Sequence, residues 1–238
     1  MKMNELEYVD WGLIPYAEAY EKQKTLFETA IERKTAREPV RNTVIFCEHP
    51  HVITLGKHGL DANLLFSEAV LKEKKVELFR VDRGGDITYH GPGQLVGYPV
   101  LDLESLHIGL KDYIYRLEEA VIRLLAEYAI QGEHFTGATG VWIDSNRPER
   151  ARKICAIGVK SSRYITMHGF ALNVSTDLNY FNLINPCGFK DKGVTSMEKE
   201  LNRKICLEEV KGRLFQLLSE TLTFNDSLLP YLPKGENK

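Results

Sequence analysis

Residues 76–103 have the sequence VELFRVDRGGDITYHGPGQLVGYPVLDL, in which apolar runs are interrupted at Gly84-Gly85 and at Gly91-Pro92-Gly93. Short runs rich in β-branched and aromatic residues, bounded by Gly and Pro, are typical of successive β-strands joined by turns. No helical pattern separates these strands. The stretch therefore favours an α+β fold over a strictly alternating βαβ fold.

The regions on either side of this stretch add helices and further strands. Before it, we expect an amphipathic helix from near Pro15, a strand over Thr43–Leu55 interrupted at His49-Pro50, and a short helix over Leu64–Lys74. After it, the spacing of apolar residues predicts helices over Leu110–Tyr128 and from Leu207 to Leu222. Three more strands are expected at Val141–Ile143, Ile154–Val159 and Tyr164–Val174.

Two local patterns complete the prediction of a mixed, largely antiparallel sheet flanked by helices. The residues Lys160-Ser161-Ser162-Arg163 separate the last two strands and suggest a hairpin, and Thr195 with Glu198 fits a capping box. No linker or repeat interrupts the chain, so residues 1–238 are expected to form one catalytic domain with a loose tail from about Asn225.

Composition excludes several classes of protein. The 238 residues contain 31 Lys plus Arg and 33 Asp plus Glu, so no overall positive charge favours nucleic acid. No apolar run reaches the length of a membrane span, and the start carries no secretory signal, so we expect a cytoplasmic protein. Four separated cysteines without a C-x-x-C pair are expected to be free thiols.

One cysteine stands apart from the others in its local sequence. Cys187 lies between Pro186 and Gly188 in the non-helical segment INPCG, where a thiol can be exposed. Cys47 and Cys155 lie in apolar strand-like runs and Cys206 at the start of the last helix, so packing explains all three. A thiol with a pKa near ~8.5 needs a base or cation beside it to act as a nucleophile.

Lys153 and the segment Arg83–Leu95 offer the remaining chemistry. Lys153 opens an otherwise apolar strand, where a solvated lysine is the simpler interpretation. The four glycines of Arg83–Leu95 would let backbone approach a ligand, although two ordinary turns would have a similar composition. His49, His51 and His58 are close in sequence, but no carboxylate or cysteine completes a recognised set of metal ligands.

Four motifs occur in order along the chain: RGGDITYHGPGQLVGYP, RKICAIGVKSSRYITMHGFALNV, FNLINPCG and DKGVTSMEKEL. Together they closely resemble the lipoyl(octanoyl) transferases over roughly Thr43–Leu201. The resemblance implies a fold shared with biotin and lipoate protein ligases and a catalytic pair formed by Cys187 and Lys153. It also implies an acyl-substrate site made by Arg83, Gly84, Gly85, Asp86, Ile87, Thr88, Tyr89, His90, Ala156, Ile157, Gly158, Gly169, Phe170 and Ala171.

The same resemblance implies partners and a reaction. Octanoyl-acyl-carrier protein would donate the acyl group. The acceptors would be lysines on the lipoyl domains of 2-oxoacid dehydrogenase complexes and on the glycine cleavage H protein. A thioester is already activated, so neither ATP nor a metal is expected. An eight-carbon chain requires an apolar pocket, for which Ile157, Phe170 and Leu95 are candidate walls.

Three other functions remain open from the sequence. An ATP-dependent lipoate or biotin ligase would share the fold but would not depend on Cys187. A cysteine amidotransferase acting between carrier proteins would differ in which protein donates the acyl group. A non-catalytic carrier-binding module would form no acyl-enzyme.

Overall fold

The structure is a computed structural model that describes residues 5–185 and 192–223. Cys187 and the expected loose tail from about Asn225 lie outside the described residues. No helix in these two ranges is both long and apolar enough to cross a membrane.

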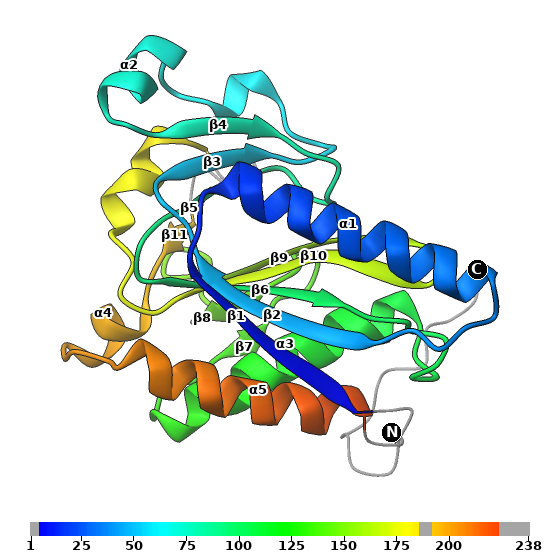
Figure 1. The fold of residues 1–238 in the computed structure, drawn as a ribbon. Helices are drawn as coiled ribbons and strands as arrows, with labels where there is room; N and C mark the ends of the chain where they lie inside the picture. The colour runs from blue at the N-terminus through cyan, green and yellow to red at the C-terminus, as the bar shows by residue number, and fades with distance from the viewer. Residues whose placement is uncertain (1–4, 186–191, 224–238) are drawn as a thin grey trace.

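A mixed sheet of eight strands forms the centre of the molecule (Figure 1). Its main path has the order β1-β2-β6-β10-β9-β8-β7, and β11 pairs with β9 beside that path. Within this sheet, as far as the structure describes it, only β1 with β2 and β11 with β9 pair in parallel, so the expected α+β fold with a largely antiparallel sheet is confirmed. The strands are β1 (Leu6–Leu13), β2 (Asn42–Glu48), β6 (Gln94–Val100), β7 (Glu133–His134), β8 (Val141–Ile143), β9 (Arg152–Ser162), β10 (Ile165–Asn173) and β11 (Gly193–Val194).

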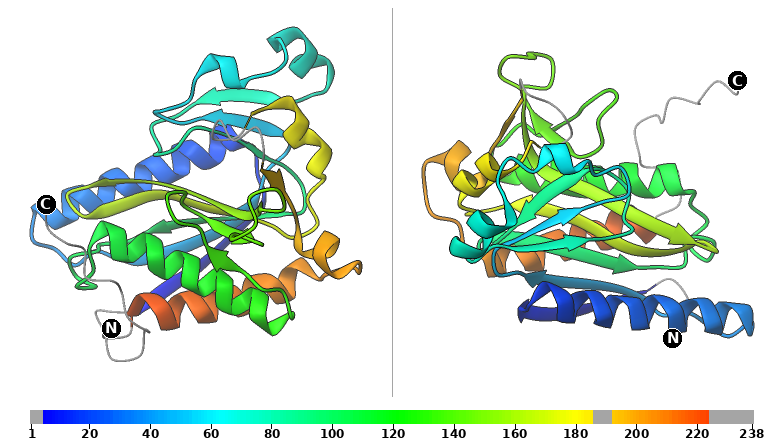
Figure 2. Two further views of the ribbon diagram at one scale, coloured as in Figure 1. Left: turned by 180° about the vertical axis from the view of Figure 1, so that it is seen from behind. Right: turned by 90° about the horizontal axis from the view of Figure 1, so that it is seen from above.

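Helices cover both faces of this sheet (Figure 2). Helix α1 (Tyr16–Thr35) covers one face, and α3 (Leu110–Glu127) with α5 (Leu207–Thr223) covers the other. Side chains of a strand point alternately to opposite faces, which explains why Phe46 packs with the α3–α5 core and Cys47 with the α1 core. A central strand such as β6 is buried along its whole length because both faces are covered.

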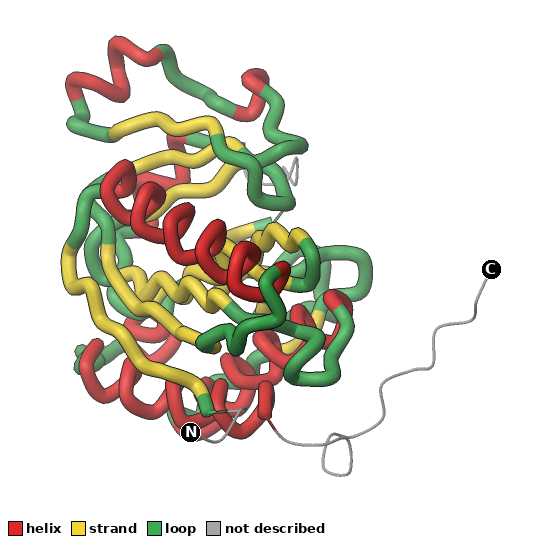
Figure 3. The backbone as a smooth tube through the Cα atoms, turned by 45° about the vertical axis from the view of Figure 1, so that its right-hand side comes forward, coloured by secondary structure: helices red, strands yellow, loops and turns green. Residues whose placement is uncertain are grey.

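A second, three-stranded sheet lies at one end of the molecule (Figure 3). It has the order β4-β3-β5, with β3 (Val52–Leu55) between β4 (Glu77–Arg80) and β5 (Ile87–His90). The break predicted at His49-Pro50 is confirmed, and it passes the chain from the large sheet to the small one. The remaining elements near this sheet are η1 (Asp61–Asn63), α2 (Glu68–Glu73) and η2 (Leu178–Leu183).

Four features of the fold differ from the prediction made from sequence. Strand β1 was not predicted, and the helix expected over Leu64–Lys74 is confined to α2. The hairpin turns at Arg163-Tyr164, where both residues have positive φ, a combination that suits a two-residue turn and lets the strand continue through Ser162.

The capping box expected at Thr195 is also wrong, because the N-cap of α4 (Met197–Leu201) is Ser196. Its hydroxyl accepts a hydrogen bond from the backbone N–H of Lys199.

Candidate active site

A pocket lies where the β9–β10 hairpin meets the segment 83–90 and strand β11. Glycine allows these segments to approach, since a Cβ at Gly158 would lie 2.7 Å from the carbonyl oxygen of Gly84. Gly97 on β6 leaves room for the ring of Phe170, which lines the pocket. The pocket wall includes these residues singled out from the sequence: Arg83, Gly85, Asp86, Ile87, Thr88, His90, Lys153, Ala156, Ile157, Gly158, Gly169, Phe170 and Ala171.

Three of the described residues expected at the acyl-substrate site do not line this pocket. Gly84 donates its backbone N–H to Val159 and so joins the loop to β9. Tyr89 is buried in the small sheet, where its hydroxyl bonds His51 and its ring stacks on Tyr180. Leu95, expected as an acyl-chain wall, packs in the α3–α5 core.

Arg83 is a buried cation that shapes the pocket loop. Its Nη2 donates to the carbonyl and hydroxyl oxygens of Thr54 at 2.8 and 2.9 Å, and its Nη1 donates to the carbonyl oxygen of Gly84 at 3.0 Å. The guanidinium therefore holds the small sheet against the loop that carries Gly84 and Gly85.

His90 is held as a neutral ring. Its Nδ1 lies 2.7 Å from the side-chain oxygen of Gln94, whose amide nitrogen donates to Asn173 and to the carbonyl of Tyr89. Nδ1 must therefore carry the proton, and Nε2 faces the Thr54 hydroxyl at 3.4 Å. Burial lowers the pKa of His90 to about 3. Both ring nitrogens are engaged with the fold, which disfavours His90 as a general base.

His168 is arranged differently. Its Nε2 lies 3.1 Å from Oδ1 of Asp82, whose other oxygen accepts a hydrogen bond from Lys160 at 2.6 Å. Burial lowers the pKa of His168 to about 4 although Asp82 opposes this shift. Its φ of +61° lies in the left-handed region, an unfavourable conformation for a residue other than glycine, and the side chain lines the pocket.

Lys153 is held at the pocket by its strand and by an aromatic ring. Its Nζ lies 4.7 Å from the ring centroid of Trp142, its β8 neighbour. Gly140, with φ of +114°, leaves space beside the lysine stem, because a Cβ there would lie 2.5 Å from the carbonyl oxygen of Cys155 and 3.5 Å from Cε of Lys153. The Nζ of Lys192 lies 4.3 Å from the ring centroid of Phe135 and 6.0 Å from that of Trp142, so two cations lie near the indole.

The described cysteines differ in exposure. Cys47 and Cys155 are buried, and burial raises the pKa of each thiol far above its ordinary value. Their predicted packing role is confirmed, and neither is poised to ionise near neutral pH. Cys206 is exposed, so the packing role expected for it is wrong.

The sequence interpretation missed several polar and aromatic residues of the pocket wall. Asn173 was missed and bonds Gln94, which belongs to the segment singled out from the sequence. Tyr98 was also missed, and it donates its hydroxyl to the neutral ring of His49 at 2.6 Å. Their signal was present, since a polar residue inside an apolar strand must find a buried partner. Tyr16 and Trp142 gave no such signal, because large aromatic residues are ordinary in cores.

The family model described as "Lipoyl protein ligase A/B catalytic domain" matches residues 15–219. A solved bipartite lipoate protein ligase from Thermoplasma acidophilum has a similar fold, with a TM-score of 0.69 over 92% of this chain and 84% of that chain at 16% identity. The match to the family model identifies a lipoyl protein ligase A/B catalytic domain, and the solved structure has the corresponding fold.

Two curated relatives are much more similar in sequence. The octanoyltransferase of Bacteroides thetaiotaomicron is 57% identical over 87% of this chain and 90% of its own length. The octanoyltransferase of Parabacteroides distasonis is 54% identical over 92% of this chain and 99% of its own length. The chain therefore belongs to the octanoyltransferases, acyltransferase enzymes of the lipoyl protein ligase A/B catalytic family.

Proposed function

We propose that this enzyme carries an octanoyl group as a thioester on Cys187 and delivers it to a lysine ε-amine on a lipoyl domain, with Lys153 moving the protons. The observation that carries the proposal is the position of Lys153, whose ammonium group lies at the pocket over Trp142. The donor is octanoyl-acyl-carrier protein. The acceptors are the lipoyl domains of 2-oxoacid dehydrogenase complexes and the glycine cleavage H protein, and the setting is the cytoplasm.

The first half-reaction exchanges one thioester for another. Lys153, as the neutral amine, takes the thiol proton of Cys187, and the thiolate attacks the thioester carbonyl of the donor. The carrier's thiol leaves with a proton, and octanoyl-Cys187 remains. Because a thioester is both reactant and product, the step requires neither ATP nor a metal.

The second half-reaction forms the amide. The ε-amine of the acceptor lysine loses a proton to Lys153 and attacks the octanoyl carbonyl on Cys187. The Cys187 thiolate leaves and regains a proton. The eight-carbon acyl chain of the octanoyl group is held in the pocket by apolar side chains such as Ile157 and Phe170. Each buried methylene of the acyl chain contributes ~0.8 kcal/mol of binding.

The experiment that tests this function is intact-mass spectrometry after mixing the enzyme with octanoyl-acyl-carrier protein. The wild type should gain the mass of one octanoyl group, and Cys187→Ser should gain no thioester adduct. The variants Cys47→Ala, Cys155→Ala and Cys206→Ala serve as matched controls and should keep the adduct. An adduct that persists in Cys187→Ser and disappears in one of the controls would refute the assignment.

A transfer assay with alkylated enzyme separates this function from an ATP-dependent ligase. Such a ligase would activate a free fatty acid as an adenylate and would survive alkylation of its thiols. Octanoyl transfer that needs ATP and free octanoate, and that persists after alkylation, would favour the ligase.

A further inference from the structure

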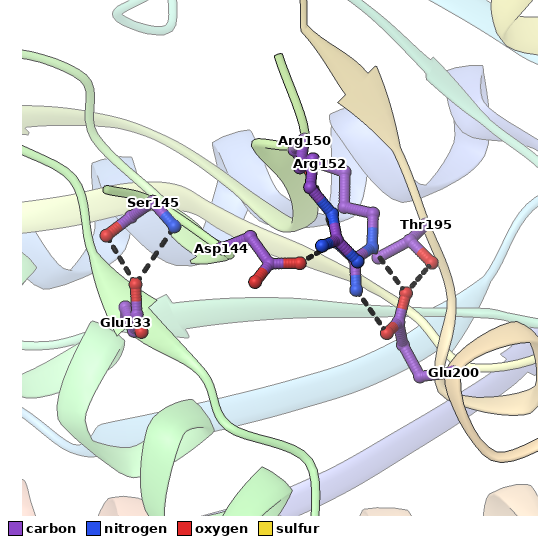
Figure 4. Close-up of polar contacts among 7 residues, drawn as sticks. All are labelled: Glu133, Asp144, Ser145, Arg150, Arg152, Thr195 and Glu200. Carbon is purple, nitrogen blue, oxygen red and sulfur yellow. Dashed lines mark hydrogen bonds and ion pairs between the residues drawn. The ribbon is translucent and has the colours of Figure 1, made fainter. Parts of the chain in front are cut away.

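An ion-pair network surrounds Arg152 at the start of β9 (Figure 4). Arg152 directly precedes Lys153, and successive side chains of a strand point to opposite faces. Lys153 lines the pocket, whereas Nε and Nη2 of Arg152 bind the two carboxylate oxygens of Glu200 at 2.7 and 2.6 Å. Such a fork-to-fork pair fixes orientation as well as charge.

The same guanidinium joins three segments of the chain. Glu200 lies on α4, and Nη1 of Arg152 donates to Asp144, which follows β8, and to the carbonyl oxygen of Arg150. Beyond Asp144, the backbone N–H and hydroxyl of Ser145 both donate to Glu133 on β7, as Figure 4 shows. The segments that flank Lys153 are thus tied together from outside the pocket.

Thr195 links Glu200 to the backbone of Lys153 through hydrogen bonds. Its hydroxyl donates to Oε1 of Glu200 at 2.5 Å, and its backbone N–H donates to the carbonyl oxygen of Lys153 at 3.0 Å. Its own carbonyl accepts from Asn173, a residue of the pocket wall. Thr195 is fully buried, so water cannot replace any of these three hydrogen bonds if Thr195 moves.

Strand β11 is placed by these contacts. Gly193 and Val194 pair in parallel with Arg152 and Lys153, so β11 borders the pocket directly beside the lysine. A two-residue parallel strand has little stability of its own. Its position depends on the contacts at its ends, namely Gly193 to Ala151 and Thr195 to Lys153 and Glu200. Val194 adds packing against the apolar side chains of the small sheet.

From this geometry we infer that Arg152 and Glu200 are positioning residues for octanoyl transfer, which hold β11 against Lys153 and thereby set where the lysine amine lies in the pocket. Neither residue contacts the pocket itself. The inference rests on the proposed role of Lys153, and it predicts a loss of turnover without a comparable loss of folding.

The test compares Glu200→Gln and Arg152→Lys with a matched pair elsewhere. Arg213 and Glu127 form a similar forked ion pair between α5 and α3, and neither residue lines the pocket, so Glu127→Gln and Arg213→Lys are the controls. In octanoyl transfer to a lipoyl domain, Glu200→Gln and Arg152→Lys should lower kcat about tenfold or more, with KM for the donor changed less than twofold. Both controls should stay within twofold of the wild type in kcat.

A second measurement does not depend on activity. Hydrogen exchange of the peptide that contains the Thr195 amide should speed up about tenfold in Glu200→Gln and stay unchanged in Glu127→Gln, with the Tm of both variants close to that of the wild type. Unchanged exchange in Glu200→Gln would overturn the inference, as would a fall in kcat no larger than in the controls. If the wild type fails to transfer the octanoyl group but hydrogen exchange in Glu200→Gln speeds up as expected, the proposed function alone would be refuted.

Discussion

At the scale of single residues, Lys153 combines two properties that a substitution can separate. A protonated lysine favours a nearby thiolate by its charge, and a neutral lysine accepts a proton. Arginine retains the charge and can lie over Trp142, but its pKa above ~12 prevents it from accepting a proton near neutral pH. Lys153→Arg therefore distinguishes an electrostatic role from a role as general base.

We expect Lys153→Arg to fold with an unchanged Tm, to form some acyl-enzyme, and to lose amide formation by about 10²–10⁴-fold, the usual contribution of a general base. Intact-mass spectrometry measures the acyl-enzyme, and the amount of octanoylated lipoyl domain measures amide formation. Amide formation near the wild-type rate would show that another group removes the proton. His168 would then be the next candidate, because both ring nitrogens of His90 are engaged with Gln94 and Thr54.

At the scale of elements, a charged clamp joins α3 to β7 and β8. His134 on β7 bonds Glu118 and Glu119 of α3 at 2.8 Å through its two nitrogens, and Glu118 also accepts the backbone N–H of Gly140 at 2.7 Å. Both nitrogens of His134 must carry protons to donate to both carboxylates. These hydrogen bonds raise the pKa of His134 to about 9.

The raised pKa predicts how stability depends on pH. The pKa of His134 is higher in the folded than in the unfolded state, so its contribution is complete below about pH 6.5 and is lost as pH rises through about 9. At pH 6, His134→Gln should lower Tm by about 2–4 °C, as expected for ~1 kcal/mol from a partly exposed pair. The difference should shrink at pH 9.5. His58→Gln, at an exposed position, is the control, and a Tm difference for His134→Gln that stays constant with pH would contradict the clamp.

At the scale of the whole molecule, the positive charges that could attract an acidic carrier domain are not equivalent. Four basic residues flank the site segments in the sequence, namely Lys160, Arg163, Lys190 and Lys192, and Lys190 lies outside the described residues. Lys160 is paired with Asp82, and Arg163 lies at the hairpin turn, ten residues or roughly 33 Å along β9 from Lys153. Lys192, in contrast, lines the pocket beside Phe135.

We therefore expect Lys192→Glu to lower kcat/KM for the acyl-carrier donor about tenfold at low ionic strength, and less as salt is added, since screening weakens long-range attraction. Arg163→Glu should leave kcat/KM nearly unchanged. Lys192→Gln should fall between the wild type and Lys192→Glu. Equal losses in Lys192→Glu and Arg163→Glu, or a loss independent of salt, would count against electrostatic steering by Lys192.

The sequence by itself determined the class of fold and the segments that build the site. The 3.6-residue periodicity of apolar residues placed α3 and α5, because each of these helices must bury one face, whereas β6 was recognised as an apolar run bounded by glycine and proline. Glycine pairs marked the loop at Gly84-Gly85 for the same local reason, since only small residues permit close backbone approach. The motifs also predict Lys153 and Cys187, one of four cysteines, as the catalytic pair.

Only the tertiary structure decided how distant side chains combine. The bonding of Arg152 to Glu200 spans 48 positions and that of His168 to Asp82 spans 86, and no local pattern encodes such a pairing. Strand β1 was missed because its stability comes from pairing with β2 and not from its own alternation. Trp142 under Lys153 was missed because an aromatic residue in a strand is ordinary until a cation is placed above it. Long-range contacts form only when distant strands and helices pack together in the folded protein. The sequence could therefore indicate which segments build the site but could not indicate the contacts of each residue in it.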